Sequence, residues 1–184
     1  LLCILMAMGI LFGVGGSVQM SVHRGTGNYE KADRYFTLSF FTLAAISLIL
    51  WIVYGAGIQV LLRLMGANDT LYPYALAYMK YINMLLPVAV FSNYVAIFVR
   101  ADGDPNRAMA GVLLGGAANI VLDIVFVFQL QMGIGGAALA SITGMVIQVI
   151  VGISHFVSSK NQLKFIRPKH VRSSIIQIIG NGIP

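Results

Sequence analysis

Asp123 is the residue whose position most strongly predicts chemistry, because it lies inside a long apolar stretch. Residues 111–128 contain no other charged side chain. A carboxylate at the centre of a bilayer costs at least about 2.5 kcal/mol on insertion scales. Asp123 is therefore a candidate functional residue, provided that it faces protein or water. The alternative is that it caps a helix or forms a structural ion pair, although no Lys or Arg lies at matching depth.

The spacing around Asp123 predicts that it shares one helix face with three other small or polar residues. Gly111, Gly115, Asn119 and Asp123 follow one another at intervals of four residues, so a helix places them in one slowly drifting stripe. The two glycines allow a neighbouring helix to come close. The amide of Asn119 then lies one turn from the carboxylate.

A tight turn after this helix is expected to bring a hydroxyl close to the carboxylate. Asp123 lies about eight residues before the turn that begins at Gln131, and Ser141 lies about eight residues after the Gly133 end of that turn. Both side chains are then predicted at similar depth, ~12 Å below the outer surface at 1.5 Å per residue. Serine is common on small-residue helix faces, so Ser141 alone indicates nothing.

Asp123, Asn119 and Ser141 together offer a carboxylate, an amide oxygen and a hydroxyl, which suit a hard monovalent cation such as Na⁺. The carboxylate could instead carry a proton. Three protein oxygens are too few to enclose a sodium ion, so another helix or water must contribute.

The third apolar stretch contributes two further candidates. Pro87 lies inside it and is expected to kink the helix or free a backbone carbonyl. Asn93 lies deeper and either lines the same cavity as Asn119 or forms an interhelical hydrogen bond.

No residues suggest an enzyme. Cys3 is the single cysteine, and no apolar stretch holds two acidic residues, whereas membrane enzymes usually need more than one buried acid or His–Cys chemistry. His23, His155 and His170 lie at loop margins and are interpreted as interfacial. Beyond Na⁺ or H⁺ as a coupling ion, no cofactor is expected.

Composition predicts an all-α polytopic membrane protein. Hydrophobic residues make up 58% of the chain and charged residues 10%, whereas soluble domains carry about 25% charged residues. The net charge of +6 lies in loops, where membrane orientation and anionic lipid explain it, and does not indicate a nucleic-acid partner. Five transmembrane helices are predicted within a domain of residues 1–157, at about 1–22, 35–62, 72–99, 108–130 and 135–157.

Residues 158–184 are predicted to form a basic cytoplasmic linker with an amphipathic helix that leads to a further span. Four isoleucines of that helix are expected to face lipid: Ile175, Ile176, Ile178 and Ile179. Basic residues predict which loops are cytoplasmic. One set of alternate loops holds Arg24, Lys31, Arg34, Arg100, Arg107 and the tail, and the other holds only Arg63, with Lys80 nearby.

Two of the loops rich in basic residues share a sequence pattern. Arg24-x-x-Gly27-x-x-x-Lys31-Ala and Arg100-x-x-Gly103-x-x-x-Arg107-Ala have the same spacing. Asp104 is predicted to cap the following helix, with Pro105 at its first position. An internal repeat of two helical hairpins and shared turn chemistry explain the pattern equally well.

Four motifs together resemble the multidrug and toxic compound extrusion (MATE) transporters. They are Gly-Thr-Gly-Asn-Tyr-Glu-Lys-Ala at 25–32, Arg-Ala-Asp-Gly-Asp-Pro at 100–105, Asn119-x-x-x-Asp123, and Met-Gly-Ile-Gly-Gly-Ala-Ala-Leu-Ala-Ser at 132–141. The cytoplasmic motif residues of the two loops are Arg24, Gly27, Arg100, Asp102, Gly103 and Pro105. The resemblance covers essentially the whole chain.

The resemblance implies a fragment: helices two to six of the first six-helix bundle in a twelve-helix, two-bundle transporter. The first helix and the second bundle are then expected as partners within one longer chain. It implies antiport across the plasma membrane, as in a bacterial inner membrane, in which an organic cation leaves while Na⁺ or H⁺ enters. It also implies that Asn119 and Asp123 belong to the cation site, with Ser141 at the hydroxyl position and Asn93 in the same cavity.

Two other functions stay open at this point. A lipid-linked saccharide flippase of the same superfamily would usually need a basic cavity for pyrophosphate, and the apolar stretches hold only the peripheral Lys80. A non-transporting membrane scaffold would show no ion-dependent flux with any ligand.

Overall fold

The computed structural model describes residues 2–64, 66, 72–167 and 171–182. Expectations for residues 65, 67–71, 168–170, 183 and 184 lie outside the described residues. Within the described part, all regular secondary structure is helical. The elements in chain order are α1 (Leu2–Gly25), α2 (Tyr29–Leu64), α3 (Tyr72–Ala101), α4 (Pro105–Asp123), η1 (Ile124–Gln129), α5 (Gly133–Ile153), η2 (Ser154–Val157) and α6 (Val171–Gly182).

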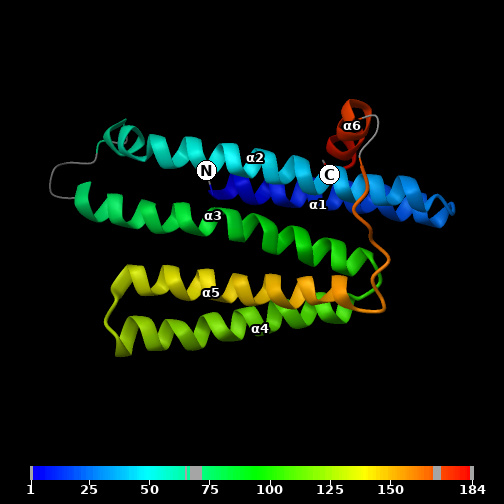
Figure 1. Ribbon diagram of the computed structural model, residues 1–184. Coiled ribbons are helices and arrows are strands. Elements are labelled where there is room, and N and C mark those ends of the chain that lie inside the picture. Colours follow the sequence, from blue (N-terminus) through cyan, green and yellow to red (C-terminus); the bar gives the residue numbers. More distant parts are fainter. Residues whose placement is uncertain (1, 65, 67–71, 168–170, 183–184) are drawn as a thin grey trace.

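Helices α1 to α5 form an up-and-down bundle in which successive helices run in opposite directions (Figure 1). Helix α3 lies in the middle and packs against α1, α2, α4 and α5. The α1–α2 turn, the α3–α4 turn and the carboxyl end of α5 gather at one end of the bundle, at the right of Figure 1. We call this end the basic end, because it carries Arg24, Arg100, Arg107 and the linker lysines.

Four helical segments are long and apolar enough to cross a membrane. They are Tyr29–Leu64, Ala75–Ala101, Pro105–Gln129 and Gly133–Val157. Helix α1 has 24 residues and packs lengthwise against α2 and α3. The chain is therefore an all-α, multi-pass membrane protein.

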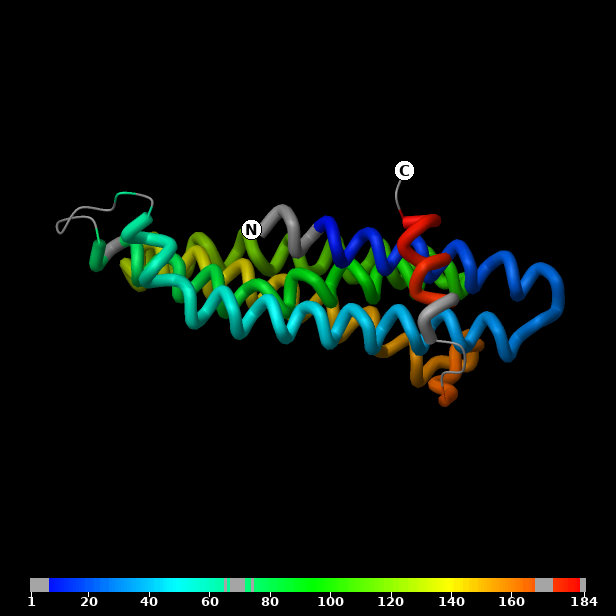
Figure 2. Tube along the Cα trace, turned by 90° about the horizontal axis from the view of Figure 1, so that it is seen from above, coloured from blue at the N-terminus to red at the C-terminus, as the bar shows by residue number. Residues whose placement is uncertain are grey.

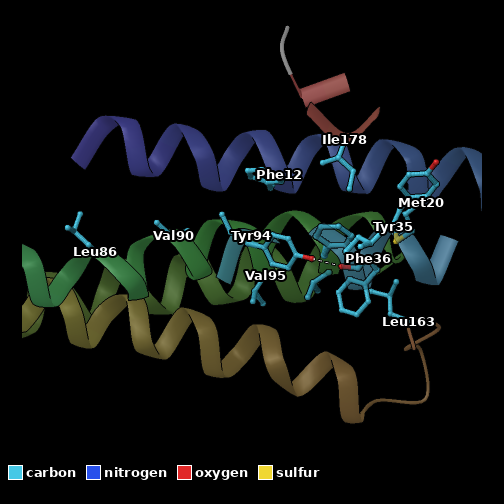
Figure 3. Packing of buried hydrophobic residues seen from close by; sticks show 14 of the residues in the cluster. Phe12, Met20, Tyr35, Phe36, Leu86, Val90, Tyr94, Val95, Leu163 and Ile178 are labelled. Atoms are coloured by element: carbon cyan, nitrogen blue, oxygen red, sulfur yellow. Dashed lines mark hydrogen bonds between the residues drawn. The ribbon is translucent and has the colours of Figure 1, made fainter. Parts of the chain in front are cut away.

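The core lies where α1, α2 and α3 meet (Figure 3). Phe12, Phe36 and Tyr94 come from these three helices and are almost fully buried. The Tyr94 hydroxyl lies 3.1 Å from the Phe36 carbonyl oxygen and 3.0 Å from the Ser39 Oγ. A buried hydroxyl needs such partners because leaving it unpaired costs free energy. The contact fixes the depth of α3 relative to α2.

The two loops with the shared sequence pattern form the same turn. The N–H groups of Gly27 and Gly103 donate to Arg24 and Arg100 carbonyls, at 2.9 and 3.3 Å. Both glycines have a positive φ, 76° and 92°, a conformation that costs glycine little.

The residue after each glycine caps the next helix. Asn28 Oδ1 accepts from Lys31 N–H at 3.2 Å, and Asp104 Oδ1 accepts from Arg107 N–H at 3.4 Å. The predicted cap at Asp104, with Pro105 in the first turn of α4, is confirmed. The shared pattern therefore encodes the same turn and cap in both loops, which an internal repeat of two hairpins would also produce.

The prediction that Ile178 faces lipid is wrong. Helix α6 packs on α1 (Figure 2), and Ile178 is fully buried in that contact. Its backbone carbonyl comes so close to Gly15 that a Cβ there would overlap it. Hydrophobic periodicity identified an apolar face but not which apolar surface would cover it. Ile176 and Ile179 remain exposed.

Candidate functional site

Helices α4 and α5 form a hairpin in which the backbones of facing glycines are in direct contact. A Cβ added at Gly115 would lie 2.5 Å from the Gly144 carbonyl oxygen, and one at Gly144 would lie 2.6 Å from the Gly115 carbonyl oxygen. A Cβ at Gly111 would meet the Gln148 carbonyl oxygen at 3.2 Å. The predicted small-residue stripe of α4 therefore faces α5 and allows the close approach.

This close approach brings Asn119 and Ser141 together. The Asn119 amide Nδ2 lies 3.4 Å from the Ser141 Oγ. The pair opens onto a cavity of about 250 Å³. Its lining residues are Val112, Gly115, Gly116, Asn119, Ser141, Gly144, Met145 and Gln148.

Asp123 lies one helical turn closer than the Asn119–Ser141 pair to the turn that connects η1 to α5. Sequence spacing predicts Asp123 and Ser141 at equal depth, but the structure places Asn119 level with Ser141. The turn between the end of η1 at Gln129 and the start of α5 at Gly133 is centred on Gln131, which lies eight residues after Asp123 but ten residues before Ser141. The cavity lining does not include Asp123.

Asp123 nevertheless has an unusual environment. Its Oδ1 is buried without a hydrogen-bond partner among the described residues. The π-helix η1 begins at the next residue, Ile124, and π-helical turns are rare and frequent at functional sites. A buried carboxylate oxygen without a donor is costly unless a proton or a cation satisfies it.

Asn93 does not join this group. Its Nδ2 donates to the Ala89 carbonyl of its own helix at 3.0 Å. Gln148, which sequence reasoning missed, connects the cavity to α3 instead, because its Nε2 lies 3.4 Å from the Ser92 carbonyl oxygen. Its position four residues after Gly144 extends the small-residue stripe of α5 and could have identified it.

Pro87 frees a carbonyl, as predicted, and the structure shows what occupies it. In an α-helix the residue 87 N–H would donate to the Asn83 carbonyl, and proline has no N–H. The Trp51 indole Nε1 of α2 donates to that carbonyl oxygen at 3.0 Å. The Trp51 indole thus satisfies the carbonyl that Pro87 leaves free in α3.

The basic end contains a buried polar cluster that ties four segments together. The Arg24 guanidinium of α1 forms an ion pair with Asp102 in the α3–α4 turn. The other oxygen of Asp102 accepts from the His155 Nε2 at 2.7 Å and from the Gln162 N–H of the linker at 3.0 Å. Asp102 therefore holds α1, η2 and the linker to one turn.

His155 is not interfacial, contrary to the sequence interpretation. It is fully buried, and its Nδ1 lies 3.4 Å from Asp104 Oδ2. Sequence position alone could not show this, because the two aspartates lie about fifty residues away in the chain. Both ring nitrogens face carboxylates, an arrangement in which an imidazolium can donate twice.

Asp104 also forms ion pairs with two basic side chains. Arg107 Nε lies 3.3 Å and Lys160 Nζ 3.7 Å from its carboxylate. Burial acts to raise the pKa of Asp104, but the His155 hydrogen bond and these cations outweigh it and hold the pKa below its ordinary value. Of the other motif residues, Arg100 is exposed and contributes its carbonyl to the turn.

The comparisons with known proteins agree with this architecture. The family model MatE matches residues 1–125. The chain is 25% identical to a protein named multidrug export protein MepA from Staphylococcus saprophyticus and 28% identical to the one from Staphylococcus aureus, over 98% of the chain in each case. It also resembles a solved inward-facing multidrug resistance MATE family transporter of the MOP superfamily, with a TM-score of 0.87 and 28% identity over 97% of the chain.

The chain spans only part of these proteins, 41% of the length of each. The match to the family model nevertheless covers more than half of the chain, and the bundle of α1 to α5 superimposes on a solved member. The chain belongs to the MatE family of transporters.

Proposed function

We propose that this chain is part of an antiporter that exports amphipathic organic cations across the plasma membrane in exchange for Na⁺ or H⁺. The observation that supports coupling is the buried Oδ1 of Asp123, which has no donor among the described residues. The names of the relatives support multidrug export.

The coupling ion has two chemically distinct ways to satisfy Asp123. A proton converts the carboxylate to a neutral acid that can donate a hydrogen bond. Sodium would need several oxygen ligands, and the Asn119 side-chain carbonyl and the Ser141 hydroxyl lie within a turn or so of the carboxylate. The remaining ligands must then come from water or from other parts of the longer protein.

Neutralising Asp123 is expected to change the packing of α4. The charge lies at the junction of α4 with the π-helix η1, and α4 contacts α5 through the backbones of Gly115 and Gly144. Close-packed contacts of this kind shift between discrete arrangements rather than deform continuously. Alternating access follows if the ion binds one arrangement more tightly than the other.

The test is efflux of a cationic dye from cells that express the full-length protein, with Na⁺ and pH gradients imposed separately. Asp123→Asn is compared with the wild type at equal membrane expression. The matched control is Glu30→Gln, which removes a carboxylate whose side chain is 71% exposed.

We expect one gradient to drive efflux in the wild type and in Glu30→Gln, and Asp123→Asn to lose that dependence. Full gradient-driven efflux by Asp123→Asn would refute the role of Asp123. Absence of dye efflux in the wild type under both gradients would instead remove the support for multidrug export.

A further inference from the structure

A second cavity, of about 400 Å³, lies at the basic end between α2, α3, α5 and the linker. All the described residues that line it are apolar or aromatic, and no polar surface is exposed inside it. Its aromatic residues are Phe36, Phe40, Phe91, Tyr94, Phe156 and Phe165. It shares no lining residue with the cavity beside Asn119.

The linker supplies one wall of this cavity. The Phe165 ring centroid lies 4.8 Å from that of Phe36 and 5.4 Å from that of Phe40. On either side of Phe165, the Lys164 N–H donates to Asp33 at 3.2 Å and the Ile166 N–H donates to the Thr37 hydroxyl at 3.1 Å. The wall is therefore fixed to α2, although 58% of Phe165 remains exposed.

We call the linker segment on either side of Phe165 the rim of the cavity, and this segment is positively charged. The linker between residues 158 and 167 contains Lys160, Lys164 and Arg167 and no acidic residue. Lys164 and Arg167 flank Phe165 closely in sequence and are exposed. Asp33, the carboxylate beside this rim, is already occupied by the Lys164 N–H and lies 4.0 Å from Arg24.

The depth of the cavity suits a lipid chain. Phe36 and Phe40 lie seven and eleven residues after Tyr29, the first residue of α2. At 1.5 Å per residue they lie ~10 and ~16 Å from that end of the helix. A chain that reaches this depth from a head group at the linker would lie alongside the apolar part of the bundle.

We propose that the cavity binds one acyl chain of an anionic phospholipid whose phosphate contacts Lys164 and Arg167. The basic rim selects an anionic head group, since each Lys or Arg near the surface attracts anionic lipid. Among the described residues, the carboxylate beside this rim is that of Asp33, which is already bonded to the linker backbone, so an organic cation meets two positive charges instead. The site is distinct from the cavity beside Asn119, and it does not depend on ion coupling.

The experiment is lipid titration of the purified, delipidated full-length protein, followed by native mass spectrometry. Phosphatidylglycerol and phosphatidylcholine with identical acyl chains are compared. The Lys164→Gln/Arg167→Gln double variant removes the charges and retains the linker backbone bonds. The matched control is Arg63→Gln/Lys80→Gln, which removes two exposed basic residues toward the opposite end of the bundle.

We expect the wild type and the control to prefer phosphatidylglycerol by about thirtyfold, from two basic groups, and the Lys164→Gln/Arg167→Gln variant to lose that preference. Val149→Phe places a ring in the cavity and is expected to weaken binding of both lipids. Equal affinity of the wild type for the two lipids would overturn the proposal. An unchanged preference in Lys164→Gln/Arg167→Gln would also overturn it, whether or not Val149→Phe folds.

Discussion

Replacing Gly115 by alanine tests whether the α4–α5 contact is as close as the structure indicates. The new Cβ would lie 2.5 Å from the Gly144 carbonyl oxygen, a backbone atom that cannot rotate away. Carbon needs roughly 3.5 Å for an ordinary contact. The two helices must therefore separate by about 1 Å or deform.

The expected destabilisation has two parts. Overpacking of a close-packed contact costs about 1–3 kcal/mol. The separation also breaks the Asn119–Ser141 contact, which at 3.4 Å is already long for a hydrogen bond, and a net hydrogen bond contributes about 0.5–1.5 kcal/mol. Alanine regains about 1 kcal/mol because it forms helix better than glycine.

Gly116 provides the matched control, because a Cβ there would meet no heavy atom within 4 Å. Gly116→Ala receives only the gain in helix propensity. The gain cancels between the two variants, which are therefore predicted to differ by about 1.5–4.5 kcal/mol in the free energy of unfolding. The assay is thermal unfolding of each purified full-length variant in the same detergent. If Gly115→Ala were as stable as Gly116→Ala, the close helix contact and the site built on it would be refuted.

Two further contacts give predictions of the same kind. Trp51→Phe leaves the Asn83 carbonyl without its donor and is expected to destabilise the protein by about 1–3 kcal/mol, and a double-mutant cycle with Pro87→Ala should remove most of that cost, because the restored N–H of residue 87 satisfies the same carbonyl. Asp102→Asn removes the closer of the two carboxylates beside the buried Arg24 guanidinium, leaving only Asp33 at 4.0 Å, and is expected to lower the free energy of unfolding by about 3–5 kcal/mol, measured by denaturant unfolding.

Glu30→Gln is the control for Asp102→Asn, since Glu30 forms an exposed pair with Arg34 and such pairs contribute about 0–1 kcal/mol. Equal stability of these two variants would contradict the structural role of the buried cluster. For Trp51→Phe, an additive cycle with Pro87→Ala would show that the indole does not act through the freed carbonyl.

Local sequence signals were sufficient for much of the fold. Long apolar runs predicted the membrane helices, and the Asp104-Pro105 pair predicted the start of α4, because a cap and a proline act on the adjacent backbone. The stripe from Gly111 to Asp123 predicted the face that meets α5. These features depend on neighbours within one or two helical turns.

Contacts between distant segments could not be predicted in the same way. His155 lies at a loop margin in sequence, yet the α3–α4 turn surrounds it with Asp102 and Asp104. Ile178 belongs to an apolar face that packs on α1, not on lipid. An apolar side chain looks the same in sequence whether lipid or another helix covers it, so only the tertiary arrangement separates the two cases.

The candidate site falls between these extremes. Sequence spacing alone placed Asn119 and Asp123 on one helix and Ser141 on the helix that faces it. The π-helix after Asp123 and the length of the turn decide which residue is level with Ser141, and neither has a distinct local signal. Gln148 completes the cavity from a position that the spacing of α5 also allows.

The most direct test of the account is ion flux through the purified full-length protein in sealed liposomes. An outward gradient of a cationic substrate is imposed, and the counter-movement of Na⁺ and of H⁺ is recorded for the wild type and for Asp123→Asn. The account predicts that one of the two ions moves uphill in the wild type and that Asp123→Asn abolishes this movement. Undiminished ion counter-flux in Asp123→Asn would contradict the claim that Asp123 carries the coupling ion.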